Sequence, residues 1–208
     1  MKGGTHGPVV VKLGGSIAFS RHLRAWISAL AACAGRAVIV PGGGPFADAV
    51  RSAQSGMGFD EEAAHHMALL AMEQYGRALI SLNGLLAAAD SAGVIHRALT
   101  AGKVPVWMPA RMALAADDVA RSWDVTSDSL AAWLAGRIGA SRLFLVKHVP
   151  FRSGRVRCDD LVAKSVVDKA FARHLRSSNL EAFLFEPTDQ DAALGAIRDG
   201  ASGGIVVE

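Results

Sequence analysis

The chain has 208 residues, 51% of them hydrophobic, and a formal net charge of +3. This length and composition suit one α/β domain over residues 1–208 and exclude a disordered chain. The small charge, with no Lys/Arg run that is interleaved with aromatic residues, argues against nucleic acid as a partner. No apolar stretch approaches the ~20 residues that span a bilayer, and the N-terminus lacks the apolar core of a signal peptide. We therefore expect a cytoplasmic protein without membrane contact.

Strand and helix patterns alternate along the chain. The unbroken apolar run Val9–Leu13 is typical of a parallel strand that is covered on both faces. Further strands are expected over Ala37–Val40, Val104–Met108, Arg142–Lys147, Ala182–Phe185 and Ile205–Val207. Helices are expected after Ser20, at Pro45, over Asp60–Ala88, from Thr126 or Ser127, from Ser165 and from Thr188. The repeated βα units predict a three-layer α/β/α sandwich with a mostly parallel central sheet and with functional sites at the carboxyl ends of its strands.

Two glycine-rich turns follow the first two expected strands. The first turn region carries a lysine, two glycines and a serine: Lys12, Gly14, Gly15 and Ser16. The second carries three consecutive glycines: Gly42, Gly43 and Gly44. Backbone N–H groups in such turns can approach an anion closely because no Cβ stands in the way. Two turns at one edge of a sheet would form one phosphate-binding surface, where Lys12 would stabilise a phosphoryl group during transfer. Phosphoryl transfer is therefore the first hypothesis.

A third segment of interest covers residues 122–132. It places two hydroxyl residues and an acid at an expected helix start: Thr126, Ser127 and Asp128. Taken alone, it is an ordinary capped helix, with Asp128 favourable in the first turn. Trp107 and Trp123 flank this region, and each could either cover a flat ring or pack in the core.

In this order, the three segments resemble the amino acid kinase family, and the resemblance runs from about Val9 to Val207. It implies the family's fold, ATP as the phosphoryl donor, and Mg²⁺ on the ATP phosphates. It also implies that Lys12 contacts the transferred group, that Asp128 orients the catalytic lysines, and that the nucleotide phosphates lie on Gly14, Gly15 and Ser16. The acceptor-binding part would cover about residues 9–135, and the nucleotide-binding part about residues 136–208.

Within this family, the Ser122–Ser129 stretch looks most like the kinases of furan-cofactor biosynthesis. Those enzymes use ATP to phosphorylate 5-(aminomethyl)-3-furanmethanol phosphate. The likeness implies a small phosphorylated acceptor that is bound by Gly42, Gly43, Gly44, Trp123, Asp124 and Thr126. Asp124 would pair with the amine of that acceptor, and a surface or capping role is its open alternative. Another phosphorylated or carboxylate acceptor would suit the same turns.

One turn departs from the family pattern. Residues 147–151 read Lys-His-Val-Pro-Phe, where family members usually carry an acid and a glycine that help to hold the nucleotide. A second catalytic lysine is expected in the later half of the chain, and Lys147 and Lys164 are its candidates. The departure leaves a second hypothesis open: a non-catalytic nucleotide- or oxyanion-binding protein on the same scaffold.

The long helical stretch Asp60–Ala88 predicts a homodimer. One of its faces carries Ala63, Met67, Leu70 and Gln74, and small residues for close packing recur at Ala64, Ala68 and Ala71. His65 and His66 in this stretch lack the spacing of a metal site. We therefore predict no metal-ligating residues and expect these histidines to pack at a subunit contact.

Overall fold

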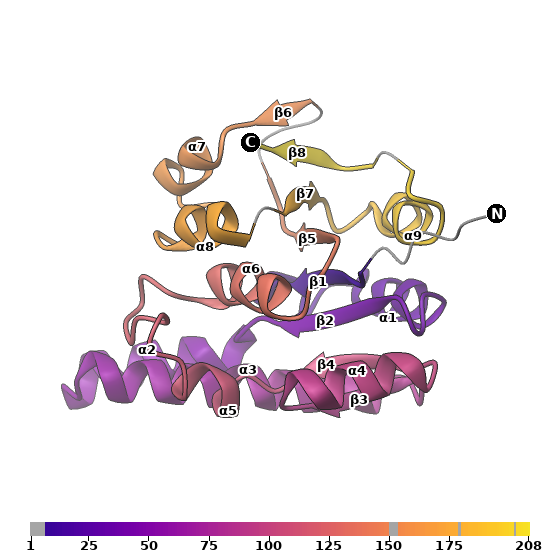
Figure 1. The fold of residues 1–208 in the computed structure, drawn as a ribbon. Helices are drawn as coiled ribbons and strands as arrows, with labels where there is room; N and C mark the ends of the chain where they lie inside the picture. The colour runs from indigo at the N-terminus through magenta and orange to yellow at the C-terminus, as the bar shows by residue number, and fades with distance from the viewer. Residues whose placement is uncertain (1–6, 150–153, 179, 202) are drawn as a thin grey trace.

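A computed structural model describes residues 7–149, 154–178, 180–201 and 203–208. In this part of the chain, one sheet of eight strands runs through the molecule in the order β3-β4-β2-β1-β5-β7-β8-β6 (Figure 1). The strands are β1 (Val9–Leu13), β2 (Ala37–Pro41), β3 (Leu86–Ala89), β4 (Val104–Trp107), β5 (Arg142–Val146), β6 (Arg155–Val156), β7 (Glu181–Phe185) and β8 (Ile205–Val207). Neighbouring strands are parallel except β7 and β8, which are antiparallel.

Helices cover both faces of this sheet, as Figure 1 shows. They are η1 (Gly15–Ile17, a 3-10 helix), α1 (Leu23–Ala31), α2 (Gly44–Met57), α3 (Glu61–Ser81), α4 (Ala92–Thr100), α5 (Ala110–Leu114), α6 (Ser127–Arg137), α7 (Cys158–Ala163), α8 (Phe171–Ser178) and α9 (Gln190–Asp199). Side chains alternate between the two faces of each strand, so Val10 packs in the cluster that contains α6 and α8, whereas Val9 and Val11 pack with α1 and α9. The predicted three-layer fold with a mostly parallel sheet is confirmed.

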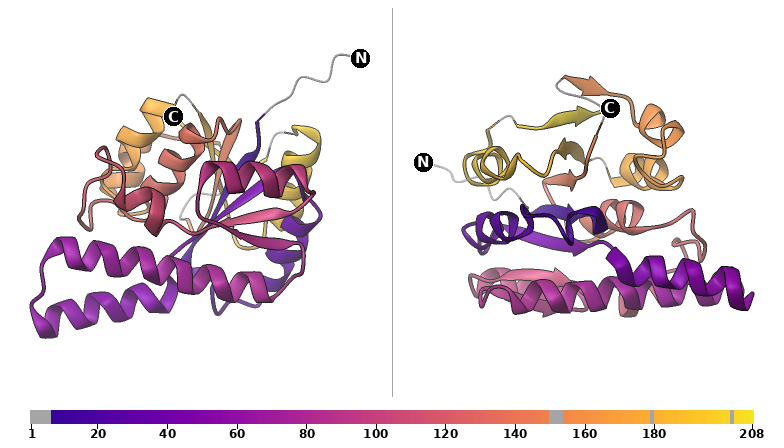
Figure 2. Two further views of the ribbon diagram at one scale, coloured as in Figure 1. Left: turned by 60° about the horizontal axis from the view of Figure 1, so that its bottom comes forward. Right: turned by 180° about the vertical axis from the view of Figure 1, so that it is seen from behind.

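The helices α2 and α3 lie side by side and extend past the carboxyl ends of the strands (Figure 2). Pro45 stands in the first turn of α2, where its missing N–H leaves no hydrogen bond unmade. Gly58 ends α2 with a φ of +73°, a conformation that glycine adopts without strain. Asp60 then caps α3 by accepting a hydrogen bond from the amide of Ala63 at 2.8 Å. Gly58 at the end of α2 and Asp60 at the start of α3 thus fix the turn between the two helices.

The stretch Asp60–Ala88, expected to be one helix, is a helix followed by a strand. α3 ends at Ser81, and Leu86–Ala89 forms β3 beside β4 at the edge of the sheet. The alanine-rich sequence of β3 favours a helix over a strand, so its local pattern conceals it. Hydrogen bonding to β4 overrides that preference. The elements α4, α5, α7 and β6 are likewise additional to those expected from the sequence.

Two residues expected near helix starts have other partners. α1 begins at Leu23, and the hydroxyl of Ser20 accepts a hydrogen bond from the amide of His22 at 3.1 Å instead of capping the helix. α8 begins at Phe171, several residues after Asp168. The carboxylate of Asp168 binds the start of a different helix, α6. A capping motif in the sequence therefore identifies a hydrogen-bonding residue but not its partner.

Candidate active site

The strand register brings three important turns to one edge of the sheet. Leu13, the last residue of β1, lies opposite Pro41 of β2 and Val146 of β5. The next residues, Gly14, Gly42 and Lys147, therefore leave the sheet at adjacent positions. Ligands of open parallel sheets bind at this end of the strands.

Lys12 and Lys147 hold one carboxylate between them. Lys12 lies on the same face of β1 as Val10, which packs toward α6. Its Nζ is 2.9 Å from Oδ1 of Asp128, a residue in the first turn of α6. Nζ of Lys147 is 2.5 Å from Oδ2 of the same carboxylate and also donates to the carbonyl of Val166. The side chains of Lys12 and Asp128 are both 5% exposed, so this cluster is buried.

Burial and charge shift the pKa values of Lys12 and Asp128. Burial is the main cause that lowers the pKa of Lys12 below its usual range; Asp128 opposes this effect, and Lys147 adds to it. Burial alone would raise the pKa of Asp128, but Lys12 and Lys147 outweigh burial and hold this pKa below the usual range of a carboxyl group. Asp128 is therefore ionised at neutral pH. With both lysines charged, these three groups carry a net positive charge that an anion can neutralise.

Asp168 anchors the start of α6, a role that sequence reasoning missed. Its carboxylate accepts hydrogen bonds from the amide and the hydroxyl of Thr126, at 2.9 and 2.7 Å. It also accepts from the amide of Ser129 at 3.0 Å and from the Ser129 hydroxyl. Free amides and the positive end of the dipole make a helix N-terminus favourable for an anion. The hydroxyl residues are visible in the sequence, but their acidic partner belongs to a distant segment.

The two glycine turns touch each other. A Cβ on Gly15 would lie 2.6 Å from Cα of Gly44, and a Cβ on Gly42 would lie 2.7 Å from the amide nitrogen of Gly15. Side chains at these positions would push the turns apart. Gly43 has right-handed φ and ψ, and Gly44 has a φ of +54°, an alternation that points successive N–H groups to one side. This backbone can cradle an anion at the N-terminus of α2.

A cavity of about 540 Å³ opens at these turns. Most of the residues predicted from the sequence line it: Lys12, Gly14, Gly15, Ser16, Gly43, Gly44, Trp123, Thr126, Asp128 and Lys147. The structure therefore brings together three segments that are far apart in the chain. Apolar side chains from α3, α6 and the loop before α6 complete the wall: Leu69, Met72, Val125 and Leu130.

Three predicted residues do not line this cavity. The amide of Gly42 donates to the carbonyl of Leu13, the last residue of the neighbouring strand β1, at 2.8 Å. The carboxylate of Asp124 lies 2.8 Å from Nζ of Lys169, and both side chains are exposed. Lys164 follows the last residue of α7. Of the two lysine candidates from the later half, Lys147 is thus the one that reaches Asp128, and the structure does not bring Asp124 to the cavity.

The tryptophans have different roles. Trp107 is fully buried and packs on Trp133 in the core, with ring centroids 6.1 Å apart, so it is not a cavity wall. Trp123 lines the cavity, and its Nε1 donates to the side-chain oxygen of Gln54 at 2.7 Å. The guanidinium of Arg51 lies 4.3 Å from the centroid of the Trp123 ring, a favourable cation–π geometry.

Arg51 and His65 line the cavity but were not among the predicted site residues. Arg51 belongs to α2 and His65 to α3, and both reach the site because the two helices extend past the strand ends. The sequence around them is an ordinary amphipathic pattern. The one available signal was a pair of adjacent histidines, which alone indicates helix packing more often than a ligand.

No group of three His, Cys, Asp or Glu side chains that could hold a metal ion occurs in the described part of the chain. Within the same ranges, no helix is long and apolar enough to cross a membrane. The turn that departs from the family pattern is described as far as Val149, and Pro150 and Phe151 lie outside the described residues.

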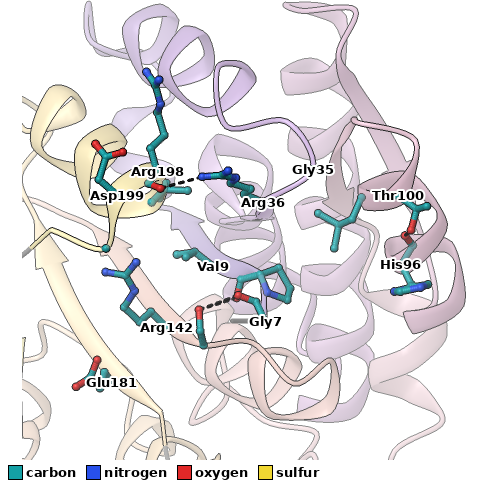
Figure 3. Close-up of a pocket in the computed structure, with 15 residues that line it drawn as sticks. Gly7, Val9, Gly35, Arg36, His96, Thr100, Arg142, Glu181, Arg198 and Asp199 are labelled. Atoms are coloured by element: carbon teal, nitrogen blue, oxygen red, sulfur yellow. Dashed lines mark hydrogen bonds between the residues drawn. The ribbon is translucent and has the colours of Figure 1, made fainter. Parts of the chain in front are cut away.

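A larger cavity, of about 830 Å³, lies at the opposite end of the sheet (Figure 3). Val9, the first residue of β1, is part of its wall. Arg36 donates to the carbonyl of Arg198 at 2.8 Å, and Arg142 donates to the carbonyl of Ala196 at 2.5 Å. These arginines satisfy carbonyls in the last turn of α9, which have no partner within the helix. None of the predicted phosphate-binding residues lies here, so we place the candidate active site in the smaller cavity.

Residues 7–151 match the amino acid kinase family. The chain belongs to this family. The match includes both glycine turns and all three residues of the Lys12–Asp128–Lys147 cluster. The prediction of a phosphotransferase enzyme is confirmed.

Similar proteins support this assignment. A [5-(aminomethyl)furan-3-yl]methyl phosphate kinase from Methanocaldococcus jannaschii is 24% identical over 186 residues, which cover 84% of this chain and 86% of that protein. The crystal structure of uridylate kinase from Archaeoglobus fulgidus has a TM-score of 0.73 at 20% identity, and the alignment covers 97% of this chain and 100% of that one. UMP kinase from Ureaplasma parvum has a TM-score of 0.69 at 16% identity, covering 98% of this chain and 99% of that one. The structural matches show the common fold.

Proposed function

We propose that this protein transfers the γ-phosphoryl group of ATP to the phosphate of a small acceptor, [5-(aminomethyl)furan-3-yl]methyl phosphate. The observation that carries the proposal is the buried Lys12–Asp128–Lys147 cluster beside two touching glycine turns. The choice of acceptor rests on the Ser122–Ser129 stretch and on the similarity to the Methanocaldococcus jannaschii kinase.

In this reaction, the protein supplies charge and position. An oxygen of the acceptor phosphate attacks the γ-phosphorus, the bond from that phosphorus to the bridging oxygen breaks, and ADP leaves with the electron pair. Lys12 and Lys147 place positive charge beside the transferring group, and Asp128 holds both ammonium groups in position. The attacking oxygen is already anionic, so no residue has to remove a proton from it.

Mg²⁺ would enter with ATP and not as an ion bound by protein carboxylates. In the described ranges no cluster of three metal-ligating side chains exists, and Asp128 is already held by two lysines. This shortage of available protein ligands fits an ion that is coordinated mainly by phosphate oxygens and water. When bound, Mg²⁺ neutralises charge on the β- and γ-phosphates.

The cavity wall that lies toward α2 and α3 suits an acceptor with a flat ring and a phosphate. Trp123 offers an aromatic face, and Leu69 and Met72 offer apolar surface. The guanidinium of Arg51 adds a positive charge on the same side, and the Gly43–Gly44 turn adds N–H donors. Phosphate would bind to the turn and to the cations, with the ring against the apolar wall.

A homodimer is part of this proposal. Met67 and Leu70 are 39% and 42% exposed, and they lie about one turn apart on α3. Ala64 and Ala71, which the sequence suggested as small residues for subunit packing, are buried within the chain instead. The contact would therefore use the exposed face of α3. Light scattering at micromolar concentration should give twice the mass of the chain, and a stable monomer would contradict this part.

A panel of acceptors tests the proposed function. The protein is incubated with ATP and Mg²⁺ and with the furan phosphate, UMP or isopentenyl phosphate, and mass spectrometry identifies any diphosphate product. We expect product from the furan phosphate. Product from UMP alone would show that the protein is a kinase but that its acceptor is UMP and not the furan phosphate. ATP binding in a calorimeter without transfer to any acceptor would favour the non-catalytic nucleotide-binding protein.

A further inference from the structure

His65 reaches the active-site cavity from one face of α3. Cavity-lining residues follow the helical spacing of three and four positions: His65, Ala68, Leu69 and Met72. His65 is only 3% exposed. The adjacent His66 is exposed and does not line the cavity. Two neighbouring histidines therefore have opposite surroundings on the same helix.

Nε2 of His65 is buried and has no hydrogen-bond partner among the described residues. The backbone carbonyl of Ser122 acts as a hydrogen-bond acceptor for the His65 ring and so favours a protonated ring nitrogen. Buried polar atoms in folded proteins are nearly always hydrogen-bonded, so an unpaired one requires an explanation. Because this nitrogen belongs to a residue on the cavity wall, a bound ligand is the natural source of its missing partner.

The protonation state of the ring decides what that partner must be. Burial is the main cause that lowers the pKa of His65 below its usual range; the Ser122 carbonyl opposes this effect, and the charges of Arg121 and His66 add to it. The ring is therefore neutral at neutral pH and carries one proton. With that proton shared with the Ser122 carbonyl, Nε2 carries a lone pair that has no donor. The ligand must then supply a hydrogen-bond donor.

Building on the proposed function, we propose that Nε2 of His65 accepts a hydrogen bond from the primary amine of the acceptor and thereby selects acceptors that carry this group. The glycine turns and Lys12 line this cavity, and in the proposed function the phosphates bind there. The other end of a short acceptor therefore lies along α3. His65 is a polar group on this otherwise apolar face, next to Leu69 and Met72.

Two carboxylates near this region are already engaged. Asp124 does not line the cavity, and its carboxylate pairs with Lys169 at 2.8 Å. Asp48 lines the cavity, but its side chain is 76% exposed and lies 3.1 Å from Arg51. A new hydrogen bond to a buried, unpaired nitrogen gains more free energy than one to an exposed, paired carboxylate. Water and a neighbouring cation already satisfy such a carboxylate.

The experiment compares two acceptors that differ only in the amine. [5-(Aminomethyl)furan-3-yl]methyl phosphate carries it, and (5-methylfuran-3-yl)methyl phosphate lacks it. His65→Leu should raise the KM for the amine-bearing acceptor by about 10- to 100-fold, the range for a lost hydrogen bond to a charged group, and should leave the KM for the methyl analogue nearly unchanged. His65→Gln should recover most of the loss, because its amide oxygen can accept the same hydrogen bond.

His66→Leu is the matched control, and it should change neither KM. An equal rise in both KM values in His65→Leu would show that His65 only supports the cavity wall, and it would overturn the inference. No rise in either KM would overturn it as well.

Failure of the kinase assay is a separate outcome. If the wild-type protein phosphorylates neither acceptor, the proposed function fails, and the ring state is then measured directly. Long-range ¹H–¹⁵N spectra, with the His65 signals assigned by their loss in His65→Gln, should show the proton on Nδ1. A proton on Nε2, or on both nitrogens at neutral pH, would overturn the inference without any activity measurement.

Discussion

Asp168 accepts hydrogen bonds from both the amide and the hydroxyl of Thr126, at 2.9 and 2.7 Å. Thr126 is the N-cap residue of α6, and Asp128 lies in the first turn of that helix. The contact joins the segment before α8 to the helix whose carboxylate lies between Lys12 and Lys147. The geometry of the proposed phosphate-binding cluster thus depends on Asp168. No hydrogen bond or ion pair found among the described residues joins Asp168 to either lysine.

Asp168→Ala is expected to weaken both the fold and the reaction. The substitution leaves the donors of Thr126 and Ser129 without their charged acceptor, so the free energy of unfolding should fall by about 2–4 kcal/mol. The kcat should also fall, because the start of α6 no longer holds Asp128 in place. Urea unfolding and steady-state kinetics measure the two effects. Asp168→Asn retains one oxygen and should lose less, and an unchanged stability of Asp168→Ala would refute the anchoring role.

Lys12→Ala is expected to lower kcat by about 10²- to 10³-fold, because a positive charge beside the transferring phosphoryl group is lost. The circular dichroism spectrum should remain that of the folded protein. Lys169→Ala is the control, since the Lys169 side chain is 77% exposed and pairs with Asp124 outside the cavity. A near-normal kcat in Lys12→Ala would remove Lys12 from the mechanism.

The lowered pKa of Lys12 predicts a pH dependence of both activity and stability. As pH rises, Lys12 loses its proton below the usual lysine value of 10.5, so kcat/KM should begin to fall at a lower pH than it would for an exposed lysine. Between the pKa of Lys12 in the folded protein and 10.5, the unfolded chain binds the extra proton, so the free energy of unfolding should rise with pH. Comparing the pH profiles of wild type and Lys12→Met isolates this contribution. Identical slopes would contradict it.

Gly15→Ala should separate the two glycine turns. The added Cβ would lie 2.6 Å from Cα of Gly44, closer than a real Cβ contact, so one turn has to move. A displacement of about 1 Å at the proposed phosphate-binding surface should reduce kcat/KM by about 10²-fold. Gly56→Ala in α2 is the matched control, because its Cβ meets nothing within 4 Å and should stabilise the helix by about 0.5–1 kcal/mol. Equal activity of the two variants would count against the shared turn surface.

Asp124→Asn should leave acceptor binding almost unchanged. Its carboxylate pairs with Lys169 away from the cavity, and an exposed ion pair contributes about 0–1 kcal/mol to stability. The KM values for ATP and for the acceptor are therefore expected to match those of wild type. A selective rise in the acceptor KM would instead restore the pairing of Asp124 with the substrate amine that the sequence suggested.

The residues proposed to carry the phosphate chemistry are visible in the sequence because each stands in a short local pattern. Lys12 is the last residue but one of an apolar strand, Gly43 and Gly44 stand between a strand and a helix-starting proline, and Asp128 follows two hydroxyl residues. Strand burial, glycine turns and helix starts are decided by neighbours within a few positions. The order of these patterns was also enough to indicate a parallel α/β fold.

Only the tertiary structure decided which of these residues meet, and which other residues join them. Asp168 reaches Thr126 across separate βα units, and His65 enters the cavity because α3 packs beyond the strand ends. Asp124, close to Asp128 in the chain, turns to Lys169 instead. The alanines of β3 form a strand because β4 offers them backbone hydrogen bonds. Such choices depend on partners that lie far away in the sequence, and local patterns of burial and capping contain no information about them.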